Sequence, residues 1–247
     1  MGAALRLALS WLTVVPAGQH HVDRVLAGRA IAVAPLIGLL LGLPAAALVS
    51  LLDLAGMPGL LAGLVTVGLL ALATRAMHLD GLADTADGLG SYGPPAKALD
   101  IMRAGGAGPF GVVSLVVVLG AQAAAFGALA GERWWAIVLA IVAGRVAFAA
   151  CCVHGIPAAR ADGLGALVAG TQHVAVPIAW LAGLVVAGVA VDRDEPWLGP
   201  VAVVVAALAA VGFVAHVRRR LGGITGDVLG ATCEVATTIV AATCTMA

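Results

Sequence analysis

The sequence predicts an all-α, polytopic membrane protein. We expect one domain over residues 1–247, a bundle of six to seven transmembrane helices with its active site at the cytoplasmic face. Three observations lead to this prediction. Of the 247 residues, 62% are hydrophobic and 11% are charged, whereas soluble domains carry roughly 25% charged residues. The apolar residues fall into segments of spanning length. The acidic, basic and glycine-rich stretches all lie between those segments.

Each expected span is an apolar stretch of about 20 residues, the length that crosses a bilayer. Six clear stretches and a more polar seventh are Ile31–Leu52, Gly59–Met77, Pro109–Ala130, Trp135–Val153, Val174–Val191, Gly199–Val217 and Val228–Met246. The stretch Leu5–Val15 is shorter, and we expect it to form an interfacial or re-entrant helix.

The distribution of positive charge predicts the orientation. With the loops on alternating sides, ten Lys and Arg residues share one side with the long connections 78–108, 154–173 and 218–227. These ten are Arg6, Arg24, Arg29, Arg75, Lys97, Arg103, Arg160, Arg218, Arg219 and Arg220. The other side holds only Arg133 and Arg193. Cytoplasmic loops are enriched in Lys and Arg, so we expect the long connections to be cytoplasmic.

The most informative motif places Asp80, Asp84 and Asp87 at positions i, i+4 and i+7. On a helix this spacing stacks all three carboxylates on one face, where they repel one another. A divalent cation between them would reverse the repulsion, and carboxylates combined with substrate phosphates suit Mg²⁺. The alternative is a solvated helix start with Asp80 as its N-cap.

His78 precedes this motif and has two interpretations. It could contact a phosphate or act as an acid or base, or it could be an interfacial residue that ends a span. Arg75 is three residues earlier, and we expect it on the same helical face, extending toward the lipid headgroups.

Two further arginine and glycine stretches could meet an anion. Arg103 precedes Gly105, Gly106 and Gly108, whose backbone N–H groups could approach a phosphate at the start of the next helix. Ordinary helix capping is the alternative. Arg160 lies in a second such turn, at 159–165, and guanidinium groups pair well with phosphate.

The C-terminal motif contains Gly223, Thr225 and Asp227, which offer a flexible backbone, a hydroxyl and a carboxylate. Glu234 follows Asp227 by seven residues, about two helical turns, and should lie on the same face. Asp227 could be a general base, a metal ligand or a helix cap. Arg145 lies inside an expected span, where it could pair with Glu234 or contact a substrate phosphate.

These motifs resemble those of the cobalamin synthase family, the adenosylcobinamide-GDP ribazoletransferases. The resemblance is carried by His78–Gly88 and by Leu221–Ala231 with Glu234. Leu99–Arg103, Gly108–Gly111 and Gly163–Gly165 fit in order and spacing, so that the likeness runs from about Leu9 to Glu234. The chain departs from the family pattern at Val14, where an arginine is usual, and at Ala104–Gly106, where polar residues are usual.

The resemblance implies a Mg²⁺-dependent transferase that joins adenosylcobinamide-GDP to α-ribazole or its 5′-phosphate and releases GMP. Its location would be the plasma (inner) membrane of a prokaryote. Its partners would be these substrates and the lipid bilayer, without nucleic acid, and a homo-oligomeric state is left open. We expect catalytic roles for His78 and the four aspartates, with metal binding by Asp80, Asp84 and Asp87. The expected substrate-binding residues are Arg103, Arg145, Arg160, Gly223, Thr225 and Glu234.

Two other functions remain as alternatives. A CDP-alcohol phosphotransferase also places spaced aspartates at a helix end, but its signature needs Asp-Gly-x2-Ala-Arg, and here Asp84 stands where the arginine should be. An ion-coupled transporter would carry its acids near the middle of the membrane, whereas Asp80 and Asp84 follow the end of an expected span.

Overall fold

The protein is an elongated bundle of α-helices. The structure, a computed structural model, describes residues 2–18 and 22–246, and these contain twelve helices and no named β-strand. The helices are α1 (Gly2–Leu12), α2 (Arg24–Ala32), α3 (Ala34–Leu54), α4 (Gly59–Ala73), α5 (Met77–Gly90), α6 (Pro95–Arg103), α7 (Pro109–Leu129), α8 (Trp134–Ala150), α9 (Gly163–Val168), α10 (Ala175–Gly188), α11 (Leu198–Leu221) and α12 (Gly226–Thr243). The expected all-α membrane bundle is thereby confirmed.

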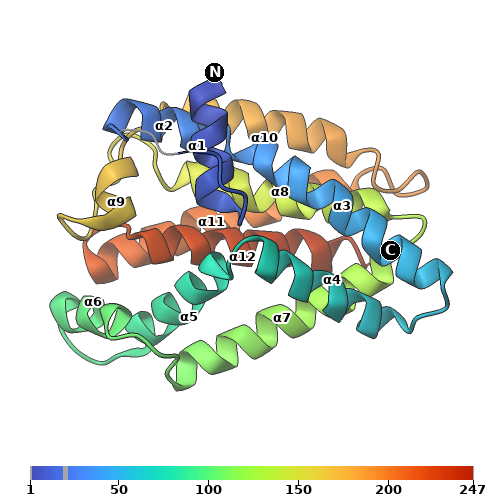
Figure 1. The fold of residues 1–247 in the computed structure, drawn as a ribbon, viewed down its shortest axis with the longest axis horizontal. Helices are drawn as coiled ribbons and strands as arrows, with labels where there is room; N and C mark the ends of the chain where they lie inside the picture. The colour runs from blue at the N-terminus through green and yellow to red at the C-terminus, as the bar shows by residue number, and fades with distance from the viewer. Residues whose placement is uncertain (1, 19–21, 247) are drawn as a thin grey trace.

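The long apolar helices run along the long axis of the molecule, as Figure 1 shows. By length and hydropathy, α3, α7 and α11 could each cross a membrane, and α4 with α5 could form a fourth, sharply bent span. The apolar helices α8 and α10 have 17 and 14 residues, fewer than the roughly 20 of a typical span. The count of six to seven spans therefore stays a prediction.

Helix α12, expected to be the most polar span, lies in the middle of the bundle (Figure 1). All of its residues are buried or half-buried. Its threonines bond to their own helix: the hydroxyls of Thr232 and Thr237 donate to the carbonyls of Val228 and Cys233, at 2.7 and 2.9 Å. Neighbouring helices shield this helix, so its polar residues need not meet lipid.

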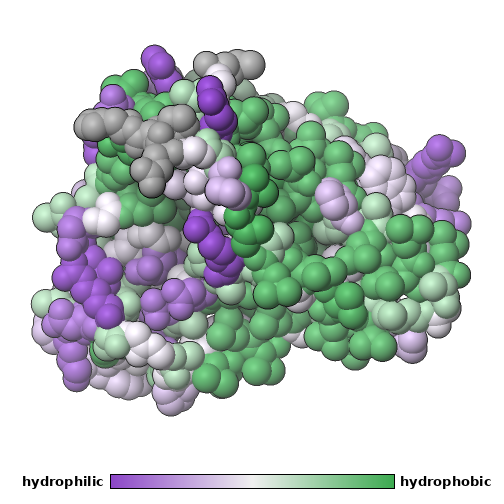
Figure 2. All heavy atoms as spheres, in the orientation of Figure 1, coloured by the Kyte–Doolittle hydropathy of each residue, from purple (hydrophilic) through white to green (hydrophobic). Residues whose placement is uncertain are grey.

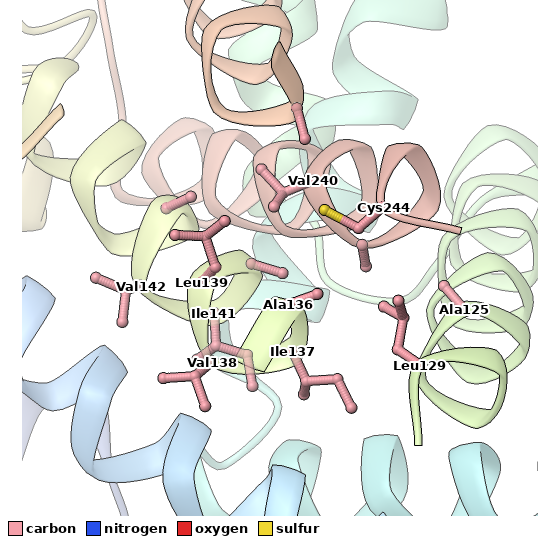
Figure 3. Close-up of a cluster of buried hydrophobic side chains, with 14 of the residues drawn as sticks. Ala125, Leu129, Ala136, Ile137, Val138, Leu139, Ile141, Val142, Val240 and Cys244 are labelled. Atoms are coloured by element: carbon pink, nitrogen blue, oxygen red, sulfur yellow. The ribbon is translucent and has the colours of Figure 1, made fainter. Parts of the chain in front are cut away.

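Helix α8 is the second interior helix, with every residue from Ala136 to Ala149 buried. Figure 3 shows its Ile137 and Leu139 in the same apolar cluster as Val240 of α12 and Leu129 of α7. The buried α8–α12 pair therefore forms the centre of the bundle, and the site is built against it.

The surface is divided as a membrane protein requires. In Figure 2 a broad hydrophobic area covers the middle of the visible face, and hydrophilic residues gather at its two ends. Helices α5, α6 and α9 lie at one of these ends (Figure 1), which we call the site end. Helix α1 lies across the long axis of the bundle (Figure 1), an arrangement that suits the expected interfacial helix.

The prediction of one continuous helix over Gly59–Met77 is wrong at its C-terminal end. Helix α4 stops at Ala73, and both Arg75 and Ala76 adopt left-handed backbone angles, with φ of 56° and 52°. The chain turns by 93° into α5, so Arg75 and His78 do not share a helical face. The Arg75 guanidinium instead donates to the carbonyls of Ser10 and Trp11, at 3.0 and 3.2 Å. Because of this break, α5 lies at the site end and does not continue the direction of α4.

Candidate active site

Helix α5 presents its three aspartates at increasing depth. Asp80 is exposed, Asp84 is half-buried and Asp87 is buried. The helix begins at Met77 with Ala76 as its N-cap, so the interpretation of Asp80 as the cap is wrong. Asp80 lies in the first turn, where a negative charge is stabilised by the helix dipole.

The start of α12 adds a fourth carboxylate to this region. Thr225 caps α12 by accepting a hydrogen bond from the backbone N–H of Val228, and its hydroxyl donates to Asp227 Oδ2 at 3.1 Å. The capping interpretation of Asp227 is therefore wrong. Arg160 Nη1 lies 3.6 Å from Asp227 Oδ2, and its Nη2 donates to the carbonyl of Leu99 at 2.7 Å. The two motifs thus meet at the site end.

Electrostatic interactions couple these groups, which lie outside the seven spans expected from the sequence. Burial, followed by the charges of Asp80, Asp227 and Asp87, raises the pKa of Asp84 to about 6, against the opposing effect of Arg160. Burial is also the largest cause that raises the pKa of Asp227, and the Thr225 hydroxyl and Arg160 oppose it. Since nearby carboxylates disfavour each other's ionised forms, this cluster would favour a bound cation.

Two glycines let α5 and α12 approach closely enough to form the cluster. A Cβ on Gly81 would lie 2.7 Å from the carbonyl oxygen of Asp227, and one on Gly230 would lie 2.9 Å from the Cα of His78. Any side chain at either position would push the helices apart and separate the aspartates of α5 from Asp227.

Asp87 faces a different partner from the other two aspartates of α5. Its carboxylate accepts backbone N–H bonds from Gly108 at 2.6 Å and from Gly111 at 3.0 Å, at the start of α7. A Cβ on either glycine would clash with that carboxylate. The anion that this glycine stretch receives in the structure is therefore Asp87 itself.

The remaining loop residues are placed at the site end with structural partners. Arg103 forms an ion pair with Asp162, and both side chains are largely exposed. Gly223 is buried, and a Cβ there would clash with the backbone of Pro157 and Ala158. Its missing side chain lets two loops pack against each other.

A second polar cluster lies deeper between α5, α7, α8 and α12. Gln122 donates to Glu234 Oε2 at 2.7 Å, and His78 Nδ1 lies 3.9 Å from Glu234 Oε1. Arg145 is 4% exposed and lines the same cavity as Glu234, about 30 Å³ in volume, without an ion pair within 4.0 Å among the described residues. The cavity that both residues line has room for a water molecule. Sequence analysis missed Gln122, although an amide inside an apolar span is an unusual feature.

His78, Cys233 and Glu234 are the one group of potential metal ligands in the described chain whose donor atoms converge within 4.8 Å. Because the cation Arg145 lies on the same cavity as Glu234, this group suits a metal ion poorly. The aspartates at the site end are spread more widely. Such spacing suits Mg²⁺, which commonly combines one or two protein carboxylates with water and substrate phosphates.

Comparison with known proteins decides the family. A family described as cobalamin-5-phosphate synthase matches residues 4–245. The chain belongs to this family. A relative named adenosylcobinamide-GDP ribazoletransferase, from Nocardioides sp., is 42% identical, with 96% of this chain and 95% of the relative covered. Relatives of the same name from Frankia casuarinae and Bradyrhizobium diazoefficiens are 41% and 35% identical, with at least 90% of each chain covered. No solved structure matches the chain.

The family assignment confirms the resemblance that was expected from the motifs. The match spans both the aspartate motif of α5 and the α12 motif, which are about 140 residues apart in the sequence but adjacent in the structure. The relatives are bacterial, which agrees with the expected prokaryotic source.

Proposed function

We propose that this protein is an adenosylcobinamide-GDP ribazoletransferase of a bacterial plasma membrane, with its site end in the cytoplasm. The observation that carries the proposal is the meeting of Asp80, Asp84, Asp227 and Arg160 at one polar end of a membrane bundle. The names of the relatives supply the substrate class.

The reaction would be a phosphoryl-type transfer. A ribose hydroxyl of α-ribazole, or of its 5′-phosphate, attacks the phosphorus that is bonded to cobinamide. The new O–P bond forms, the diphosphate bond breaks, and GMP leaves. The hydroxyl proton must pass to a base, and such reactions depend mainly on positioning and on stabilising charge.

The donor set fits the magnesium ion that this chemistry needs. The carboxylates of Asp80, Asp84 and Asp227 lie near one guanidinium, that of Arg160. The cluster therefore has an excess of negative charge when all of these groups are ionised. We propose that Asp80 and Asp84 hold the ion, with Asp227 beside them, and that Asp87 supports them by anchoring α5 to the start of α7. A bound Mg²⁺ would neutralise charge on the substrate diphosphate.

The other residues would have separate roles. Arg160 and Arg103 would pair with phosphate oxygens, and Thr225 and Gly223 would shape the entry to α12. Asp227, kept outside the metal shell, could accept the hydroxyl proton, since a raised pKa makes a carboxylate a better base. His78, Arg145 and Glu234 would fix the deeper polar cluster beneath the site.

GMP release tests the proposal directly. Purified protein in detergent is mixed with adenosylcobinamide-GDP labelled in its GMP part, α-ribazole and Mg²⁺. We expect labelled GMP to appear only when the acceptor is present. Turnover of a CDP-alcohol, or ion flux without GMP release, would overturn the proposal in favour of one of the two alternatives.

A further inference from the structure

A second cavity, of about 360 Å³, opens between α8, α10 and α11, away from the aspartates. Its walls include Ile178 of α10 and Val211 of α11, both more than half exposed, and its floor reaches the buried Ala236 of α12. The cavity is therefore an open groove in the apolar part of the bundle, and we call it the α10–α11 groove.

The lining of this groove is apolar except at one end. Among the described residues that line it, Arg218 is the one that carries a charge. Arg218 lies in the last turn of α11, at the site end, and its side chain is exposed. Its Nη2 donates to the carbonyl of Gly155 at 3.2 Å, which uses one of the five N–H donors of the guanidinium.

The length of the groove limits what can occupy it. On α11 the lining runs as one helical stripe from Val203 to Arg218, about 22 Å at 1.5 Å per residue. Half of a hydrocarbon core is about 15 Å thick, so the groove extends through a whole leaflet. A compact polar substrate would leave most of this apolar length unfilled, whereas a linear hydrocarbon chain would cover it.

We infer that the α10–α11 groove is a binding site for an anionic phospholipid. One acyl chain lies along the stripe of α11, and the phosphate pairs with Arg218 at the site end. A guanidinium at the membrane surface favours anionic over zwitterionic lipid by charge. This site is separate from the aspartate cluster, and the inference does not depend on the proposed function.

Two matched pairs of variants test the site. Ala207 lines the groove and Ala209, two residues away on the same helix, does not, so Ala207→Phe fills the groove and Ala209→Phe is its control. Arg218→Gln removes the charge at the mouth, and Arg219→Gln removes an exposed neighbouring charge that is outside the lining.

The measurement is native mass spectrometry of the delipidated, full-length protein, titrated with dioleoyl-phosphatidylglycerol or dioleoyl-phosphatidylcholine. We expect wild type and Ala209→Phe to retain one phosphatidylglycerol that Ala207→Phe loses. Arg218→Gln should reduce the preference for phosphatidylglycerol by about fivefold, with a much smaller effect of Arg219→Gln.

Several outcomes would overturn the inference. Equal retention of both lipids by wild type would remove the anionic site, whatever the variants do. Retention of phosphatidylglycerol by Ala207→Phe would place the lipid elsewhere. A wild-type dimer that Ala207→Phe converts to a monomer would show that a second copy occupies the groove. Arg218→Gln changes an exposed side chain, so the test stands even if Ala207→Phe misfolds.

Discussion

Of the site carboxylates, Asp84 is the one whose ionised form a bound cation should stabilise most, because the charges of Asp80, Asp227 and Asp87 all act on it. Asp84→Asn keeps the shape of the side chain and removes its charge. We expect the rate of GMP release to fall by about 100-fold or more, which is about 2.7 kcal/mol of transition-state stabilisation. The matched control is Asp100→Asn, an exposed aspartate on the neighbouring α6. A normal rate with normal Mg²⁺ dependence in Asp84→Asn would refute its assignment as a ligand.

Asp227 can now be tested as a base or a ligand, since Thr225 has taken the capping role. We expect Asp227→Asn to lower the rate about tenfold or more, which is about 1.4 kcal/mol, and to leave the unfolding midpoint unchanged. Loss of a base lowers the rate constant at unchanged Mg²⁺ affinity, whereas loss of a ligand raises the Mg²⁺ requirement.

The control for Asp227→Asn is a variant of Thr225, the residue that caps α12. Thr225→Val should lower the unfolding free energy by about 1 kcal/mol, the usual cost of a lost N-cap. An Asp227→Asn enzyme with near-normal turnover at limiting Mg²⁺ would remove Asp227 from the chemistry altogether.

At the scale of the elements, Asp87 links α5 to the start of α7 through the N–H groups of Gly108 and Gly111. Asp87→Asn replaces one acceptor oxygen by a donor that faces an N–H group. We expect the unfolding free energy to fall by about 1–3 kcal/mol, the cost of an unsatisfied buried polar group. Thermal unfolding in detergent measures this loss, and Asp80→Asn, on the exposed turn, should show little. Unchanged stability with a raised Mg²⁺ requirement would return Asp87 to the metal site.

The features of the site that depend on residues close together in the sequence were predictable. The spacing of Asp80, Asp84 and Asp87 predicts one helical face, and all three lie on α5. The partners of that face were not predictable, because they depend on tertiary contacts. Asp87 receives the N–H groups of α7, and α5 meets α12 through glycines whose role becomes visible only when the two backbones are adjacent.

The fold was predictable for a different reason, the composition of whole segments. Apolar runs of spanning length predict helices, since a bilayer leaves few other ways to satisfy the backbone. The left-handed turn at Arg75 and Ala76 contains no glycine or proline, so the sequence did not predict it. The central place of α12 was also hidden, because its threonines look unsuited to a span until the surrounding helices are known.

At the scale of the whole molecule, orientation in the membrane is the feature that the positive charges predict. The four cysteines of the described chain are buried and free, so replacing them by alanine gives a background for single-cysteine labelling. We expect Arg193→Cys, on the exposed connection between α10 and α11, to react with a membrane-impermeant maleimide in intact cells. Ala96→Cys on α6 and Arg219→Cys on α11 are also exposed, but should react only after permeabilisation.

The physical reason lies in the asymmetry of the two ends. With the loops on alternating sides, as expected from the sequence, ten basic residues share the side that carries the aspartates and two lie on the other. Moving so many cations outward across the membrane is unfavourable. An enzyme that uses nucleotide-linked substrates also needs its carboxylates where those substrates are made. GMP release by everted membrane vesicles, but not by intact cells supplied with the same substrates, would agree with the labelling. Labelling of Ala96→Cys from outside intact cells would contradict the orientation, and with it the cytoplasmic active site.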